Sequence, residues 1–256
     1  MIDLHCHILP GLDDGPKTIE ESLAMAEDGI ADGITHVICT PHASSDYTFD
    51  YAKVRAACNG LNARLGGRLT LATGCDLHLN HENLTALRDD PRPFCLNQQD
   101  YLLVEFNEFS IPPAMDQTLH ELQLAGLRPI ITHPERNAIL RTHPERLERW
   151  VRHGSFVQVT AGSLAGVFGP GPEEHAWNWI ASGLVHFICS DAHNTGRRPL
   201  RLKFAYGAVA ERMGEEVARS YFFENPLAAF EGRPLPYTPN IAPSSQPKRK
   251  KRFFFF

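Results

Sequence analysis

Short apolar runs recur along the chain, their starts separated by roughly 25–35 residues, as repeated strand–helix units would place them. The runs are MIDLHC, THVICT, LTLATG, YLLVEF, RPIITH, SFVQVT and LVHFICS. The intervals between them carry helical patterns, and this alternation is typical of an α/β fold with a parallel sheet. Because the runs are almost continuously apolar, we expect each strand to be buried on both faces. Seven such units favour a (β/α)7 barrel over a doubly wound sheet.

One helix has a clear predicted start and end. Thr18 and Glu21 form a capping box, and Gly33 provides a stop. Between them the apolar residues fall on one helical face, namely Ile19, Leu23, Ala26 and Ile30. The sequence therefore predicts an amphipathic helix directly after the first strand.

The composition changes near Pro234, where Pro and Ser become frequent and the chain then ends in KRKKRFFFF. We expect one folded domain over residues 1–233 and a disordered tail over residues 234–256. Five consecutive basic residues followed by four phenylalanines are also a pattern that contacts anionic membrane surfaces. The alternative interpretation is an inert tail.

Charge and cysteine content narrow the class of protein. A formal net charge of −5 and a pI near 6.2 give no reason to expect a nucleic-acid partner. The 6 cysteines are scattered without a CxxC pair, which indicates a reduced, cytoplasmic protein. The sequence has no apolar stretch as long as the ~18 residues of a membrane span. A histidine cluster in the first seven residues leaves no room for a signal peptide of ~15–30 residues.

Polar residues gather where the apolar runs end. Six of the seven runs end in polar residues that include potential metal ligands: His5, His7, Asp13 and Asp14; His42; Asp76 and His78; Glu105 and Glu108; His133 and Glu135, which Arg136 follows; and Asp191 with His193. In parallel α/β enzymes the carboxyl ends of the strands form the mouth at which active sites lie. We therefore expect these side chains to converge.

The spacing within two of these groups suggests a shared site. In a strand, His5 and His7 project to one side while Cys6 points to the other, and Asp191 and His193 alternate in the same way. The donors are imidazole nitrogens and carboxylate oxygens without thiolate, a set suited to manganese, iron or zinc. Many carboxylates favour a multinuclear cluster with bridging oxygens, and the chemistry indicated is metal-assisted hydrolysis.

Five motifs in order carry a family resemblance. The segments MIDLHCHILPGLDDGPKTIEESLAMA, CTPHAS, YLLVEF, ITHPERN and SDAHNTGRRP resemble the polymerase and histidinol phosphatase (PHP) superfamily. Within it, the chain is most similar to the manganese-dependent protein-tyrosine phosphatases of bacterial capsule and exopolysaccharide operons. The resemblance extends from Met1 to about Pro226.

This resemblance implies a distorted (β/α)7 barrel of the PHP type that holds about three divalent metal ions, expected to be manganese. The implied ligands are His5, His7 and Asp191 for one ion, Glu105 and His133 for a second with Asp76 bridging the two, and Asp14, His42 and His193 for the third. Arg136 and Arg198 match phosphate-binding arginines, and His42 is a candidate proton donor. The family often has Glu at the position of Asp76, so a shorter carboxylate must bridge the ions here.

The implied substrate is a phosphotyrosine protein, namely an autophosphorylating bacterial tyrosine kinase that regulates polysaccharide export. Two alternatives stay open: a PHP phosphoesterase acting on a small phosphate such as histidinol phosphate, and a metal-dependent scaffold without activity. His78 and Glu108 are expected to lie beside the ligands, and Asp13 is expected to form a turn. Six further histidines lie outside this pattern and are expected on the surface or in the core: His36, His120, His143, His153, His175 and His186.

A second phosphatase chemistry is also present as a pattern. In CNGLNAR, Cys58 and Arg64 have the C-x5-R spacing of cysteine-dependent tyrosine phosphatases, whose thiolate needs a phosphate-binding loop between a strand and a helix. The flanking residues instead predict a helix, with Val54, Ala57, Leu61 and Leu65 on one face. We therefore interpret the spacing as coincidental.

Overall fold

The computed structural model describes residues 1–241, and each of the seven apolar runs forms a strand in it. These strands are β1 (Ile2–Cys6), β2 (His36–Cys39), β4 (Thr70–Thr73), β6 (Tyr101–Glu105), β7 (Arg128–Thr132), β8 (Phe156–Thr160) and β9 (Phe187–Cys189). Two further short strands, β3 (His42–Ala43) and β5 (Asp76–His78), were not predicted separately. They continue β2 and β4 after interruptions of two residues.

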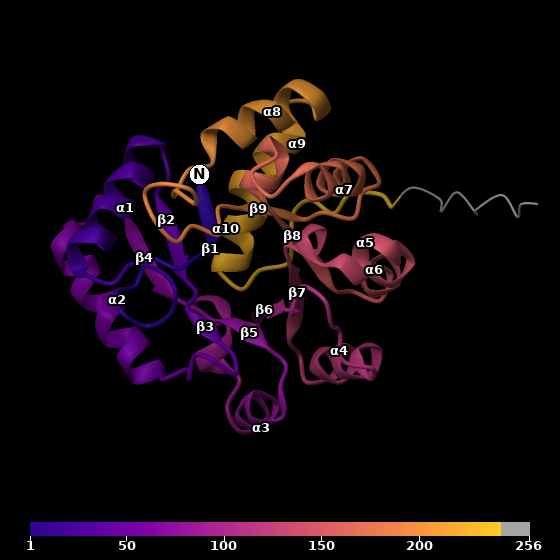
Figure 1. Cartoon of the computed structure of the whole chain (residues 1–256), viewed down its shortest axis with the longest axis horizontal. Coiled ribbons are helices and arrows are strands. Elements are labelled where there is room, and N and C mark those ends of the chain that lie inside the picture. The colour runs from indigo at the N-terminus through magenta and orange to yellow at the C-terminus, as the bar shows by residue number, and fades with distance from the viewer. Residues whose placement is uncertain (242–256) are drawn as a thin grey trace, which may run out of the picture.

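The strands are parallel and follow one another around a central axis (Figure 1). One sheet has the order β1-β2-β4 and the other the order β3-β5-β6-β7-β8-β9. Because β2 runs into β3 and β4 runs into β5, the two sheets are linked along the chain. The order returns from β9 to β1 through one isolated parallel bridge between Cys6 and Ala192. The predicted α/β class is confirmed, and the circuit of strands is completed by that bridge.

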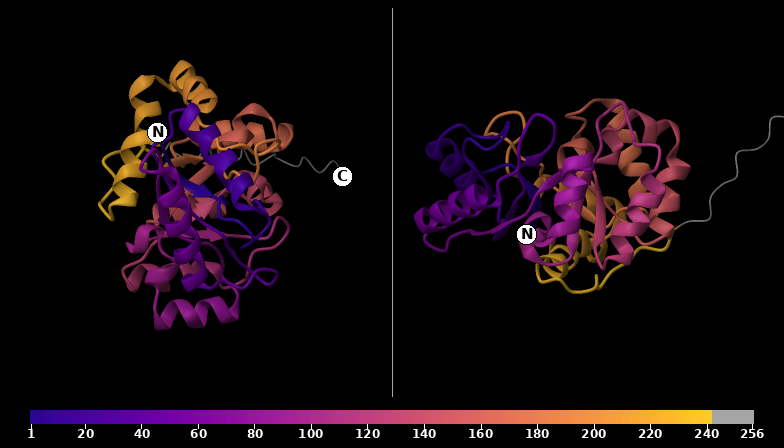
Figure 2. Two further views of the ribbon diagram at one scale, coloured as in Figure 1. Left: turned by 90° about the vertical axis from the view of Figure 1, so that its left-hand side faces the viewer. Right: turned by 90° about the horizontal axis from the view of Figure 1, so that it is seen from below.

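Ten α-helices surround the strands, as Figures 1 and 2 show for the described residues. They are α1 (Ile19–Ala31), α2 (Tyr51–Leu65), α3 (His81–Asp89), α4 (Met115–Leu124), α5 (Ala138–Thr142), α6 (Pro144–Arg152), α7 (Pro170–Ala181), α8 (Lys203–Met213), α9 (Glu215–Arg219) and α10 (Asn225–Phe230). The first begins as predicted, because the Thr18 side chain accepts a hydrogen bond from the Glu21 amide at 3.3 Å. The Glu21 carboxylate, however, accepts from the amide of Lys17 rather than from that of Thr18.

Part of the apolar core packs on the amino-terminal side of the polar strand ends. The side chains of Tyr101, Leu103 and Glu105 lie on the same face of β6, and those of Tyr101 and Leu103 are fully buried. They belong to an apolar cluster that includes Ile130, Phe187 and Ala229 of α10. This packing lies on the amino-terminal side of the polar strand ends and gives them a rigid base.

The segment after residue 233 is packed against the domain as far as the structure describes it. The Tyr237 amide donates to the Asn225 side chain at 3.1 Å, and the Tyr237 ring lies edge-on to Tyr221. Ile241 packs against the same core. The predicted boundary at 233/234 therefore precedes the last packed residues. KRKKRFFFF lies outside the described residues, and no helix among residues 1–241 is long and apolar enough to cross a membrane.

Candidate metal and phosphate site

The residues expected to bind metal converge at the carboxyl ends of the strands. The Nε2 atoms of His5 and His7 lie 3.2 Å apart, and His5 Nε2 lies 3.3 Å from Asp76 Oδ2. The strands β1 and β5 therefore bring their polar residues to one point, as parallel alignment requires. His5, His7 and Asp76 are almost fully buried, so their polar atoms have little access to solvent.

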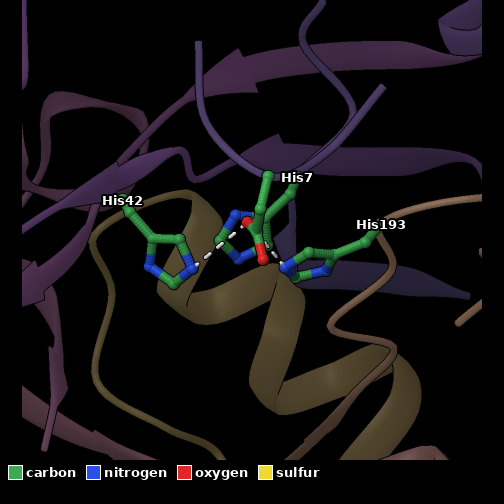
Figure 3. Close-up of side chains that lie close together, drawn as sticks. His7, His42 and His193 are labelled. Carbon is green, nitrogen blue, oxygen red and sulfur yellow. Dashed lines mark ion pairs between the residues drawn. The ribbon is translucent and has the colours of Figure 1, made fainter. Parts of the chain in front are cut away.

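A second group lies at the outer edge of this cluster and contains His7, Asp14, His42 and His193. Its donor atoms all lie within 4.8 Å of one another. Figure 3 shows the rings of His7, His42 and His193 turned toward one another. Asp14 Oδ1 lies 3.2 Å from His193 Nε2 and 3.5 Å from His42 Nε2. The three residues expected to hold the third ion are thus together, with His7 beside them.

A third group joins Asp76, Glu105 and His133. His133 Nε2 lies 3.3 Å from Glu105 Oε1, and the rings of His42 and His78 also face Glu105, at 3.2 Å and 2.5 Å from its Oε2. Asp76 belongs both to this group and to the group of His5 and His7. Its location between the two groups is what a bridging carboxylate needs.

Asp191 lies between the histidines and two arginines. Its Oδ1 is 3.4 Å from His5 Nε2, while its Oδ2 accepts from Arg136 and, at 2.5 Å, from Arg198. Both guanidinium groups also face the ring of Phe168, at 4.7 Å and 5.9 Å from its centroid. The arginines singled out in the sequence are therefore side by side at the edge of the cluster.

Backbone strain is found at two of the expected ligands. His133 has φ of +29° and Asp191 has φ of +51°, in a region that residues with a Cβ rarely adopt. Such conformations persist where the surrounding structure imposes them, and they gather at functional sites. Here each follows the end of a strand and turns a donor into the cluster.

The buried donors are a good fit for divalent cations. Both carboxylate oxygens of Asp76, the Nδ1 of His42 and the Nε2 of His193 are buried without a hydrogen-bond partner. An unpaired buried polar atom costs about 1–3 kcal/mol, which a bound cation would offset. The donors are nitrogen and oxygen, and every cysteine is buried as a free thiol. This donor set suits manganese, iron or zinc.

Negative charge dominates the electrostatics of the cluster. Burial alone would lower the pKa of His42, but the carboxylates of Asp76 and Glu105, at 3.3 Å and 3.2 Å from its Nδ1, outweigh it and raise that pKa to about 11. Burial alone would raise the pKa of Asp76, yet His5 and His42 bring it down to about 2. Without a cation these carboxylates thus favour the positively charged form of the His42 ring, and a cation must displace a proton to bind the nitrogen.

Two supporting residues were missed by the sequence reasoning. Asp13, expected only to form a turn, accepts from the Gly15 amide as a turn former does, but its Oδ2 also pairs with His7 Nδ1 at 2.6 Å. Gln158 Oε1 lies 3.0 Å from His5 Nδ1. Partners of this kind fix the orientation and tautomer of a metal-binding imidazole. The doublet Asp13–Asp14 was visible in the sequence, whereas nothing distinguished Gln158 within an apolar strand.

Replacing Asp13 by Ala is expected to weaken metal binding by about 10–100-fold, the usual cost of losing the carboxylate behind a ligating histidine. Without Asp13 the His7 ring loses the contact that fixes its orientation. It also loses the negative charge that makes Nε2 a better metal ligand. Titration of metal-free protein with Mn²⁺ measures the effect, with the exposed Glu20→Ala in α1 as a matched control. An affinity equal to that of wild type would return Asp13 to the role of a turn former.

An open cavity of about 220 Å³ adjoins the cluster. Its lining includes His42, His78, Glu105, His133 and Arg136, and Tyr47, Phe106 and Glu108 also contribute. His78 lies beside the ligands as expected, with its Nε2 at 2.5 Å from Glu105 Oε2. The cavity therefore gives a small molecule access to the expected ligands and to one arginine at the same time.

Comparisons with known proteins found similar proteins that match most of the chain. The family model described as "Capsular polysaccharide synthesis, CpsB/CapC" matches residues 1–231. The tyrosine-protein phosphatase YwqE of Bacillus subtilis is 36% identical over 221 residues, which is 85% of this chain and 87% of that protein. A solved structure titled as YwqE from Bacillus subtilis and CpsB from Streptococcus pneumoniae, "unique metal-dependent tyrosine phosphatases", has a TM-score of 0.87 at 33% identity and covers 95% of this chain and 100% of that one.

A more distant structure shares the fold alone. It is a histidinol phosphate phosphatase from Lactococcus lactis, with a TM-score of 0.56 at 13% identity over 87% of this chain and 96% of that one. The expected architecture of the PHP type is consistent with this likeness. At such low identity it carries no information about substrate.

Proposed function

This chain belongs to the CpsB/CapC family of capsular polysaccharide synthesis proteins, and we propose that it acts as a metal-dependent protein-tyrosine phosphatase. One observation carries the proposal beyond family membership: the expected nitrogen and oxygen ligands meet at the carboxyl ends of the strands with two arginines at their edge. This combination matches hydrolysis of a phosphate ester. A purely structural metal site has no need of two arginines beside an open cavity.

We propose the ligand assignment that the family resemblance implies. His5, His7 and Asp191 hold one ion, Glu105 and His133 a second with Asp76 bridging, and Asp14, His42 and His193 the third. The observed groups support it, because Asp76, Glu105 and His133 form one of them and the third set falls within another. Manganese is the proposed metal, since the donors are nitrogen and oxygen; iron and zinc suit the same donors.

Divalent ions bound here would polarise the phosphoryl oxygens and lower the pKa of bound water, so that hydroxide is available near neutral pH. Arg136 and Arg198 bind the equatorial phosphoryl oxygens through charge-assisted hydrogen bonds, which strengthen as negative charge develops in the transition state. In the structure both guanidinium groups donate to the Asp191 carboxylate. A bound phosphate would therefore accept from N–H groups that point at this carboxylate in the structure. No cysteine is needed as a nucleophile.

The departing tyrosine oxygen has little need of an acid, because the pKa of tyrosine is about 10 and the phenolate leaves readily. His42 was a candidate proton donor. Its two nitrogens face different carboxylates, Asp14 on one side and Asp76 with Glu105 on the other. These contacts support a role as ligand, and the proposed assignment therefore uses the ring to hold metal, while proton donation by His42 stays a prediction.

The proposed substrate is the phosphotyrosine segment of an autophosphorylating bacterial tyrosine kinase that regulates capsule or exopolysaccharide synthesis. The proposed location of this reaction is the cytoplasm. Metal-loaded protein assayed on a phosphotyrosine peptide and on histidinol phosphate tests this proposal against its nearest alternative. Preference for the peptide supports it. Preference for histidinol phosphate would contradict it, and no turnover of either would favour the scaffold interpretation.

Metal analysis of purified, manganese-loaded protein is expected to give about three ions per chain, because nine ligands are too many for one octahedral site. Replacing Asp76 by Ala is expected to lower both the metal content and the rate, since one carboxylate serves two groups. Elemental analysis of the two proteins after identical gel filtration measures this. A reproducible content of one ion or less in wild type would contradict a cluster, and full retention in the variant would contradict the bridge.

A further inference from the structure

A second cavity, of about 210 Å³, lies beside the candidate site, and we call it the flanking pocket. It is formed by the segment that follows β8, the segment that follows β9 and the start of α8. Its lining includes three large apolar side chains and three arginines: Val167, Phe168, Phe204, Arg197, Arg198 and Arg201. The flanking pocket therefore combines an apolar surface with positive charge.

The apolar surface of the flanking pocket is unusual for this protein. Among residues 1–241, the large hydrophobic side chains that are exposed are Phe109, Leu124, Val167 and Phe204. Two of these four, Val167 at 38% and Phe204 at 46% exposure, line this one cavity. Exposed apolar side chains that gather in a concave surface rimmed by polar groups mark binding sites.

The charge of the flanking pocket differs from that of the chain. The protein has a formal net charge of −5, yet the residues that line this cavity include three arginines and no Asp or Glu. Arg201 forms an ion pair with Asp28 at 3.4 Å, which is weak because the arginine side chain is half exposed. A surface of this kind attracts an anionic partner.

The flanking pocket adjoins the phosphate-binding arginines. Arg198 lines it and also donates to Asp191 in the candidate metal site. Phe168 lines it too, and its ring faces the guanidinium groups of both Arg136 and Arg198. A polypeptide whose phosphate is held by these two arginines therefore passes directly beside the flanking pocket.

We infer that the flanking pocket binds the residues next to phosphotyrosine in an acidic peptide, with an apolar or aromatic side chain against Val167 and Phe204 and a carboxylate facing Arg197 and Arg201. This inference rests on the proposed function, because it names the sequence context of the same substrate. It makes the protein selective for phosphotyrosine within acidic, apolar segments. A small phosphate ester would gain nothing from the flanking pocket.

The test uses full-length, metal-loaded protein and three substrates: a phosphotyrosine peptide with acidic flanks, the same peptide with Asn and Gln in place of the acids, and para-nitrophenyl phosphate. Wild type is expected to prefer the acidic peptide, mainly through a lower KM, and this preference should shrink in high salt. The double variant Arg197→Glu, Arg201→Glu is expected to lower the ratio of kcat/KM on the acidic peptide to that on para-nitrophenyl phosphate by about tenfold.

Two further variants keep the test decisive. Phe204→Ala removes apolar contact without changing charge and is expected to lower the same ratio for both peptides. Arg64→Glu reverses an exposed charge at the carboxyl end of α2 and is the matched control. Unchanged ratios in all pocket variants, with phosphotyrosine still hydrolysed, would overturn the flanking pocket alone. If metal-loaded wild type hydrolyses no phosphotyrosine substrate, the proposed function and the flanking pocket both fail.

Discussion

Exhaustive treatment with EDTA is expected to abolish turnover of a phosphotyrosine peptide, and added manganese is expected to restore it. The chain's own groups cannot replace the cations, because the cluster holds buried carboxylates and imidazoles but no activated nucleophile among the described residues. A loss of at least about 10³-fold is expected, since bound cations would provide both the hydroxide and most of the charge stabilisation. Initial rates before chelation, after it and after titration with Mn²⁺ measure the effect.

The matched control for chelation is Cys58→Ser. Cys58 lies within α2, which confirms the helix predicted around the C-x5-R pattern, and its side chain is 2% exposed on the buried face of that helix. A thiol in mid-helix has no phosphate-binding loop around it. The variant is expected to keep at least about half of the activity, since a helical thiol has no catalytic role. An enzyme that survives chelation but is inactivated by Cys58→Ser would overturn the metal mechanism.

The strands and the convergence of their polar ends could be predicted from the sequence because both follow from one pattern. Buried parallel strands read as continuous apolar runs, and their carboxyl ends must meet at one edge. His5 and His7 followed from this rule together with strand alternation. The same rule predicts that they lie beside Asp191 and His193, which follow another strand of the same set.

The interruptions between β2 and β3 and between β4 and β5 could not be predicted in the same way. β2 is interrupted before β3 at Pro41, which has no amide to donate to a neighbouring strand. β4 is interrupted before β5 near Gly74, where a Cβ would lie 2.6 Å from the Ile38 side chain. The interruptions depend on contacts between strands that are about 35 residues apart in the sequence. Such pairings are visible only in the folded chain.

The supporting contacts of the candidate site were also beyond the sequence. Gln158 meets His5 across 153 positions of the chain, and both arginines meet the same oxygen of Asp191. Periodicity indicates which face of an element is buried, but it does not indicate which polar side chains pair across a barrel. The role of Asp13 illustrates this point, because its turn was predictable and its contact with His7 was not.

Replacing Arg136 or Arg198 by Ala is expected to lower kcat/KM on a phosphotyrosine peptide by about 10²–10³-fold each, the usual cost of removing one donor to the transition state. The bound metal should be retained, because a guanidinium group stays protonated and has no lone pair to offer a cation. Rates measured together with metal content separate the two effects. Arg146→Ala is the matched control, since that guanidinium also faces an aromatic ring, at 5.4 Å from the centroid of Trp150 in α6.

The double variant adds a sharper expectation, because the two guanidinium groups are not independent. Both donate to Asp191 Oδ2 and both face Phe168, so removing one changes the surroundings of the other. Effects of residues in contact are not additive, and the double variant is therefore expected to lose less than the product of the single losses. Activity within about twofold of wild type in either single variant, where a transition-state donor should matter, would make that arginine a structural partner of Asp191. Loss of metal in parallel with activity would instead show that the arginines act by holding Asp191 in position.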